Sequence, residues 1–140
     1  MKIVEANIAD KTAIDTFYVE QGYHSNWSET ERAFICRHED KVIGAVKVER
    51  IEGVSILRGM YIDEAFQKMG LGSQFLQHIE PILNETLSYC MPLAHVASFY
   101  TQIHFNEVFE QEYPAFLAER CKAYRAAGYE IKTMRRAKKL

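Results

Sequence analysis

Residues 67–72 read Gln-Lys-Met-Gly-Leu-Gly, and this stretch with two glycines is the most informative part of the chain. It lies between an apolar, strand-like run over residues 54–62 and an amphipathic, helix-like run over residues 73–87. A glycine-rich turn from a strand into a helix leaves backbone N–H groups unpaired, and the helix dipole adds partial positive charge there. Such a turn can bind a pyrophosphate, because glycines allow close approach to the backbone. The alternative is a tight turn whose glycines only supply positive φ angles.

Two named phosphate motifs are excluded by the residues around this turn. The stretch has no Gly-Lys-Ser/Thr ending, so it is not a P-loop. Phe75 stands where a dinucleotide-binding fingerprint would need its third glycine, so that motif is absent as well. A phosphate-binding turn of another kind remains the hypothesis.

Composition predicts one folded domain over residues 1–140. Of the 140 residues, 48% are hydrophobic and 26% are charged, as in ordinary globular proteins. The net charge is −2 and the pI is about 6.2, so the overall charge does not indicate nucleic-acid binding. Residues 132–140 hold five basic side chains and no acidic one, which favours a solvated end, with an RNA-binding tail as the alternative.

The sequence also predicts a cytoplasmic location without membrane insertion. No run of residues approaches the length of a membrane span, and the N-terminus lacks the apolar core of a signal peptide. The three cysteines are widely spaced, which is typical of reduced thiols. The cysteines and histidines lack zinc-like spacing, so no metal site is expected.

Hydrophobic periodicity and turn residues predict an alternating order of strands and helices. Gly59 within a strand indicates a bulge or a close backbone approach, and Pro81 within a helix indicates a kink or an early end. Residues 23–31 are expected to form a loop or a short helix. Strands are predicted over residues 2–6, 32–39, 41–51, 54–62, 88–93, 105–109 and 129–136, and helices over 7–22, 73–87, 95–104 and 114–128.

Three motifs stand together within this order, namely Leu57-x-x-Met60-x-Ile62, Gln67-x-x-Gly70-x-Gly72 and Phe99-Tyr100. With them the chain resembles, over nearly its whole length, the GNAT superfamily of acyl-CoA-dependent N-acyltransferases. The segment Leu57-Arg58-Gly59-Met60 is similar to an uncharacterised bacterial-type subgroup. The resemblance implies an α+β fold in α/β/α layers. Its mixed, mostly antiparallel sheet of about seven strands is flanked by helices and splays open between strands four and five.

The resemblance implies that acetyl-CoA, as co-substrate, lies in the gap between these two strands. The strand backbone would pair with the pantetheine arm, amides of the glycine turn would hold the pyrophosphate, and Gln67 would brace that turn. The cofactor-binding residues implied in this way are Met60, Tyr61, Ile62, Gln67, Lys68, Met69, Gly70, Leu71, Gly72, Ser73 and Phe99.

Two residues are the candidates for catalysis. By resemblance, the Tyr100 hydroxyl would lie near the CoA sulfur and donate a hydrogen bond to the departing thiolate. The alternative is that Tyr100 is a core aromatic residue. An imidazole can transfer a proton at neutral pH, which makes His95 a candidate base, although it could instead cap a helix or bond a carbonyl. Glu49 and Glu52 could point into the cleft as bases, but solvent exposure on an antiparallel sheet is favoured for each, and a nucleophilic Cys90–His95 pair is not favoured.

Three positions depart from the superfamily pattern. Gln67 replaces a common arginine, which keeps hydrogen bonding but removes a charge. Leu93 stands where many members have an asparagine, and His104 stands where a glycine is usual. These differences are expected to weaken the binding of CoA or to change the wall of the acceptor site.

The expected function is transfer of an acetyl group from acetyl-CoA to a primary amine of an unidentified small molecule or peptide, by direct attack. The alternative is a catalytically weak CoA-binding or protein-interaction module of the same fold. The acceptor is expected against the first helix and residues 23–27, where Tyr23, His24 and Trp27 are aromatic and polar. No nucleic-acid partner is expected, and a homodimer is one option because dimers are common in the superfamily.

Overall fold

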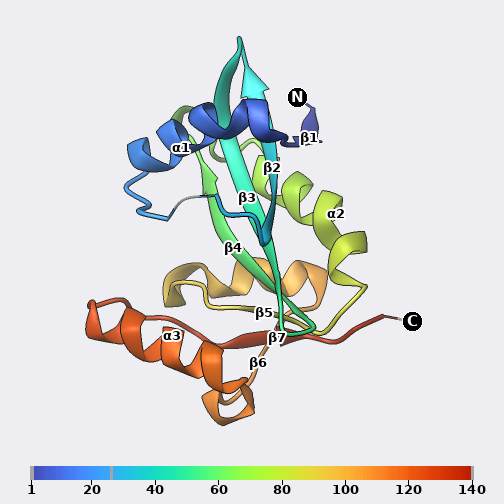
Figure 1. Ribbon diagram of the computed structural model, residues 1–140, viewed down its shortest axis with the longest axis vertical. Coiled ribbons are helices and arrows are strands. Elements are labelled where there is room, and N and C mark those ends of the chain that lie inside the picture. Colours follow the sequence, from blue (N-terminus) through green and yellow to red (C-terminus); the bar gives the residue numbers. More distant parts are fainter. Residues whose placement is uncertain (1, 26, 140) are drawn as a thin grey trace.

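The computed structural model describes residues 2–25 and 27–139, and within them seven strands form one sheet (Figure 1). The strand order is β1-β2-β3-β4-β5-β7-β6, with β4 and β5 parallel and the other neighbours antiparallel. This confirms the mixed, mostly antiparallel sheet. The strands are β1 (Ile3–Glu5), β2 (Glu31–His38), β3 (Lys41–Ile51), β4 (Val54–Ile62), β5 (Ser88–Cys90), β6 (Asn106–Glu107) and β7 (Met134–Arg136).

Helices cover both faces of the sheet, which confirms the α/β/α layering (Figure 1). On one face α1 packs through Ile14 and Phe17, and α3 packs through Leu117. On the other face α2 packs through Phe75 and Leu76. The helices are α1 (Lys11–Glu20), α2 (Leu71–Leu83) and α3 (Ala115–Ala126), with shorter or 3-10 segments at Ile8–Asp10, Glu64–Phe66, Ala94–Ile103 and Glu110–Glu112.

The predicted bulge is present in β4. Ala45 of β3 is opposite Tyr61, whereas Lys47 is opposite Arg58, so one residue of β3 faces two residues of β4. Gly59 lies in this irregular stretch with φ +61°, a left-handed conformation that favours glycine. The bulge bends β4 locally, while Tyr61 and Ile62 beyond it stay paired with Ala45 and Gly44 of β3.

The predicted splay lies directly after the bulge. β4 and β5 pair over residues 55–57 and 88–90, where β5 ends. β4 continues to Ile62, so residues 58–62 extend beyond this pairing and border a gap. Their backbone groups on that side are available to a ligand, as on any strand edge.

Several predicted elements differ at their ends. α2 stops at Leu83 instead of residue 87, which is the early end that Pro81 indicated. Strand β7 begins at Met134 instead of residue 129, since Ile131 makes only an isolated bridge with Leu93. Pro114 caps α3 instead of being its first residue. Within the described ranges no helix combines the length and the hydropathy needed to cross a membrane.

Candidate functional site

The glycine turn has the geometry of an open helix N-terminus. Lys68 and Gly70 both adopt left-handed conformations, with φ values of +66° and +77°. The side-chain amide of Gln67 donates a hydrogen bond of 3.0 Å to the carbonyl of Ile62, which ties the turn to the end of β4. The Gln74 N–H bonds the Gly70 carbonyl at 3.1 Å. The amides of the three residues before Gln74 therefore precede the first helical hydrogen bond of α2.

The second glycine of the turn has a packing role. A β-carbon on Gly72 would lie 2.9 Å from the Cζ atom of Phe99, closer than real β-carbons approach other atoms. Phe99 and Tyr100 contact each other edge to face, with ring centroids 5.2 Å apart. The 94–103 segment therefore packs directly on the start of α2, and the glycine turn and the Phe-Tyr pair form one local structure.

A groove of about 750 Å³ runs along these elements. It unites residues from the end of β4 that extends beyond β5 and from the adjacent glycine turn with residues of the 94–103 segment, which comes later in the sequence. Met69 is the one predicted site residue that does not line it, and this residue is 57% exposed. The predicted residues that line the groove are Met60, Tyr61, Ile62, Gln67, Lys68, Gly70, Leu71, Gly72, Ser73, His95, Phe99 and Tyr100.

Five further residues line the groove and were not predicted. Ser98 and Gln102 lie three and seven positions after His95, so helical periodicity alone could have placed them on its face. Gln21, at the end of α1, had no local signal, because only the packing of α1 on the sheet brings it here. The complete additional set is Gln21, Phe66, Val96, Ser98 and Gln102.

Tyr100 is held in its protonated form. Burial raises the pKa of its phenol well above the ordinary value, and Cys90 and Tyr61 act in the same direction. A phenol in this environment keeps its proton at neutral pH and can donate a hydrogen bond. His95 is exposed at the opening of the groove.

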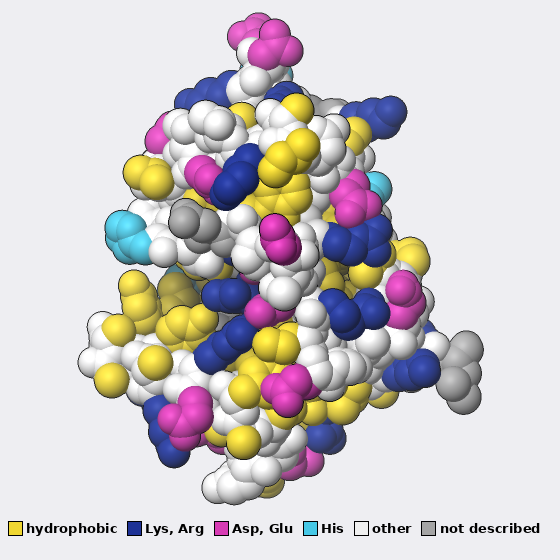
Figure 2. Space-filling view, viewed as in Figure 1, with side chains coloured by type: hydrophobic (Ala, Val, Ile, Leu, Met, Phe, Trp, Pro, Cys, Tyr) yellow, Lys and Arg dark blue, Asp and Glu magenta, His cyan; other side chains and the backbone are white. Residues whose placement is uncertain are grey.

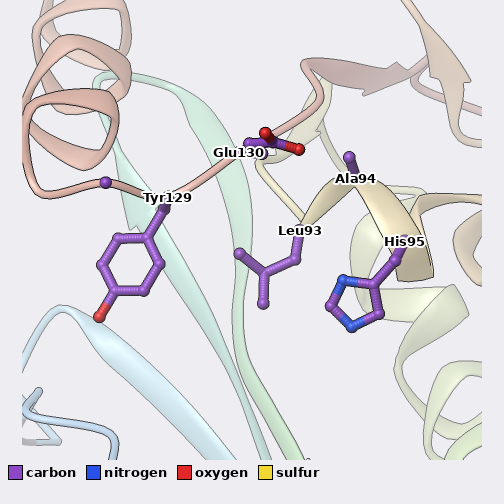
Figure 3. A pocket seen from close by; sticks show the side chains of 6 residues that line it. Leu93, Ala94, His95, Tyr129 and Glu130 are labelled. Carbon is purple, nitrogen blue, oxygen red and sulfur yellow. The ribbon is translucent and has the colours of Figure 1, made fainter.

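A second hollow, of about 500 Å³, adjoins the groove and shares His95 with it (Figure 3). The Leu93 side chain points between those of Tyr129 and His95, whereas Glu130 points away from them. The position where the resemblance favours asparagine therefore presents an apolar wall. Gly128 and Ala94 complete the lining.

The expectation that Glu49 is exposed is wrong. Its exposed fraction is 5%, and Arg120 of α3 donates to both of its carboxylate oxygens at 2.7 and 3.1 Å. Arg58 contacts it at 3.3 Å. Burial acts to raise the pKa of Glu49, but the two arginines outweigh burial and the pKa is lowered. Glu49 is therefore a poor proton acceptor, whereas Glu52, in the β3–β4 turn, is exposed as expected.

The bulge is tied to α1 by a hydrogen bond that the sequence did not indicate. The hydroxyl of buried Tyr18 donates to the carbonyl of Gly59 at 2.9 Å. Lys47 lies over the rings of Tyr18 and Tyr23, with Nζ 5.4 and 5.3 Å from their centroids. Its ammonium pairs with Glu31 at 3.0 Å. Burial lowers the pKa of Lys47, with Glu31 acting against the shift.

The remaining candidates have structural roles. Cys90 is buried in β5, and burial raises the pKa of its thiol well above the ordinary value, so it is a poor nucleophile. His104 ends the 94–103 segment with φ +75°, a conformation for which the superfamily's usual glycine is suited. Across the described ranges, no three His, Cys, Asp or Glu residues are grouped to hold a metal ion.

A family model described as an acetyltransferase (GNAT) domain matches residues 29–107, which include the bulge, the glycine turn and the Phe-Tyr pair. The chain belongs to the GNAT acetyltransferases. As a GNAT protein it is an acyltransferase, and its co-substrate is acetyl-CoA. The search of curated proteins gives no match.

Solved GNAT structures share this fold at low sequence identity. The ribosomal-protein-S18-alanine N-acetyltransferase of Escherichia coli matches with a TM-score of 0.70 and 18% identity, over 99% of this chain and 94% of that one. A spermidine N-acetyltransferase chimera from Vibrio cholerae matches with a TM-score of 0.69 and 15% identity, over 98% and 96%. The N-acetylglutamate synthase of Neisseria gonorrhoeae, complexed with coenzyme A, matches at 0.69 and 17%, over 96% of this chain and 34% of that one.

Proposed function

We propose that this GNAT protein transfers the acetyl group of acetyl-CoA to a primary amine of a small molecule or peptide by direct attack. The observation that carries the proposal is the groove, in which the unpaired end of β4, the glycine turn and Tyr100 face one space.

The groove residues suit the two ends of CoA. The N-terminus of α2 offers backbone amides and partial positive charge to the pyrophosphate, and Lys68 adds a formal charge. Gln67 holds the turn in place through its bond to Ile62. The backbone of residues 60–62 offers strand-type hydrogen bonds to the amides of the pantetheine arm.

Acetyl transfer forms a C–N bond and breaks the C–S bond of the thioester, while the amine loses a proton to a base and the sulfur leaves as the CoA thiolate. The Met60 N–H, at the bulge, donates to the carbonyl oxygen as negative charge develops on it. The Tyr100 hydroxyl stabilises the departing thiolate by a hydrogen bond, because its raised pKa keeps it protonated. His95 accepts the proton of the attacking amine, directly or through water.

The acceptor approaches along the wall formed by α1 and residues 23–27, with Asn26 outside the described residues. Tyr61 lines the groove, and its ring lies 5.1 Å from that of Tyr23 and 6.1 Å from that of Tyr18. This aromatic surface continues from the groove to α1. It suits a small or peptide-like amine.

Thermal unfolding with acetyl-CoA, CoA and ATP in parallel tests the co-substrate site. A ligand that binds only the folded state adds about 2.7 kcal/mol of stability at a hundredfold excess over its Kd. We expect a raised Tm with both CoA species and no comparable shift with ATP. No shift with millimolar CoA would overturn the proposal.

A Tyr100→Phe variant tests catalysis separately from binding. We expect kcat to fall about tenfold to a hundredfold with little change in the Kd for CoA, because the lost hydrogen bond acts on the leaving thiolate. Tyr89→Phe is the matched control, since Tyr89 is buried against α3. A wild-type protein that binds CoA but acetylates no amine would instead support a binding module.

A further inference from the structure

Five charged side chains meet beside the bulge, and we call them the charged cluster: Glu31, Lys47, Glu49, Arg58 and Arg120. Three cations and two anions leave a formal charge of +1. On the face shown in Figure 2, basic side chains with acidic ones between them gather at mid-height, between the parts of the surface formed by α1 and α3. A partly buried excess charge is costly unless a counter-charge accompanies it.

The two carboxylates of the charged cluster are already engaged. Arg120 holds Glu49 through both guanidinium Nη atoms. Glu31 accepts hydrogen bonds from Lys47 and from the backbone and side chain of Ser28, at 3.2, 2.9 and 3.1 Å. Their side chains are 7% and 1% exposed. A cationic group of a ligand, such as a second amine of a polyamine, would therefore find no open carboxylate here.

Arg58 is the member of the charged cluster whose guanidinium has incomplete hydrogen bonding. It contacts Glu31 and Glu49 through the same atom, Nη1, at 3.4 and 3.3 Å, which are long distances for charged hydrogen bonds. Its Nε and Nη2 atoms have no hydrogen-bond partner among residues 2–25 and 27–139. The Arg58 side chain is 19% exposed and that of Arg120 is 27% exposed, so solutes can reach both.

Arg58 also lies next to the reaction centre of the proposed function. It directly precedes Gly59 of the bulge, and Met60 and Tyr61 line the groove. A β-carbon on Gly59 would lie 3.3 Å from the Cε atom of Lys47, so the charged cluster lies directly against the bulge. A carboxylate paired with Arg58 would therefore hold a nearby amine at the bulge.

We propose that the acceptor is an amine that carries its own carboxylate, a free amino acid, whose carboxylate is bound by Arg58. The proposal rests on the proposed acetyl transfer and names its substrate class. Arginine suits this role because its planar fork binds a carboxylate with two parallel hydrogen bonds. The added anion brings the charged cluster to neutrality, and the aromatic wall of Tyr23 and Tyr61 lies beside the amino acid side chain.

The first test compares free amino acids with their carboxamides as acceptors, by thiol release from acetyl-CoA with the full chain. L-phenylalanine against L-phenylalaninamide and L-glutamine against L-glutamine amide are suitable pairs within the standard amino acid panel. We expect at least one free amino acid to exceed its amide about tenfold in kcat/KM. The amide has the less basic amine, so its reactivity would favour the opposite result. Equal or better use of amides would overturn the proposal.

A second test uses Arg58→Gln and Arg58→Lys, with Arg32→Gln as the control, because Arg32 pairs with Glu5 on the exposed surface. We expect Arg58→Gln to raise KM for the amino acid at least tenfold, without changing the Kd for acetyl-CoA or the use of the amide. Arg58→Lys keeps the positive charge but lacks the planar guanidinium, so its KM for the amino acid should lie between those of wild type and Arg58→Gln. Equal losses of kcat/KM for the amino acid and for its amide would overturn the proposal.

A third test needs no variant and no turnover. We expect millimolar amino acid, and not its carboxamide, to raise the Tm of the wild-type protein. If acetyl-CoA does not bind, the proposed function fails, and the Tm shift still decides whether Arg58 holds a carboxylate. If acetyl-CoA binds and amines without a carboxylate are the acceptors, acetyl transfer stands and the carboxylate site is wrong. The absence of a shift with every standard amino acid would also overturn it.

Discussion

A β-carbon on Gly72 would lie 2.9 Å from the Cζ atom of Phe99, so the glycine turn and the Phe-Tyr pair fit together only while residue 72 has no side chain. Gly72 is within α2, where its own φ angle does not require glycine. The contact links two motifs that are 27 positions apart in the sequence.

Gly72→Ala should therefore destabilise the protein, although alanine normally stabilises a helix by about 1 kcal/mol relative to glycine. We expect a net loss of about 1–2 kcal/mol in the free energy of unfolding, together with weaker CoA binding, because the Phe99 ring must move. Denaturant unfolding and CoA titration measure both effects. In the double variant Gly72→Ala/Phe99→Leu the loss should largely disappear, whereas additive losses would contradict the contact.

Tyr18→Phe tests the hydrogen bond that holds the bulge. We expect about 1 kcal/mol of lost stability, because the Gly59 carbonyl loses a buried donor. We also expect a lower kcat with a nearly unchanged KM for acetyl-CoA, since the bulge orients the Met60 N–H toward the thioester carbonyl oxygen. Tyr113→Phe is the control, because its hydroxyl donates to the carbonyl of Cys90 and accepts from the Met134 N–H, away from the bulge. Equal effects of both variants on kcat would argue against a positioning role.

Gln67→Arg should tighten CoA binding severalfold, because it adds a positive charge next to the proposed pyrophosphate position. The gain should shrink as salt rises, since the interaction is exposed. Gln77→Arg adds the same charge on the exposed face of α2 and serves as the control. CoA titrations at two salt concentrations compare the variants. Equal gains from both would indicate a general charge effect.

The pKa of Glu49 predicts acid sensitivity. Its pKa is lowered in the folded protein, so its contribution to stability is present above the unfolded value of about 4.5. That contribution is lost as the pH falls through the folded pKa. Glu49→Gln should be less stable than wild type by about 2 kcal/mol at neutral pH, because Arg120 loses its partner. The gap should narrow below pH 4.5 in urea unfolding curves, and a constant gap would contradict the assignment.

The sequence alone determined the elements of this protein and most residues of its groove. Strand alternation, the helical stripe of α2 and the glycines near residue 70 are local signals, because a turn, a bulge or a helix face depends on nearby residues. The predicted Gly59 bulge and the open start of α2 are confirmed for this reason. The family also followed from these motifs.

Only the tertiary structure decided which polar groups beside the site are buried and which partners they have. Glu49 reads as an exposed strand carboxylate until α3 places Arg120 on it, 71 positions away in the sequence. Tyr18 reads as a helix core residue until α1 places its hydroxyl on Gly59. No local pattern encodes these contacts, because burial and charge pairing depend on which distant segments pack together, and that packing sets the pKa values and hydrogen bonds of the site.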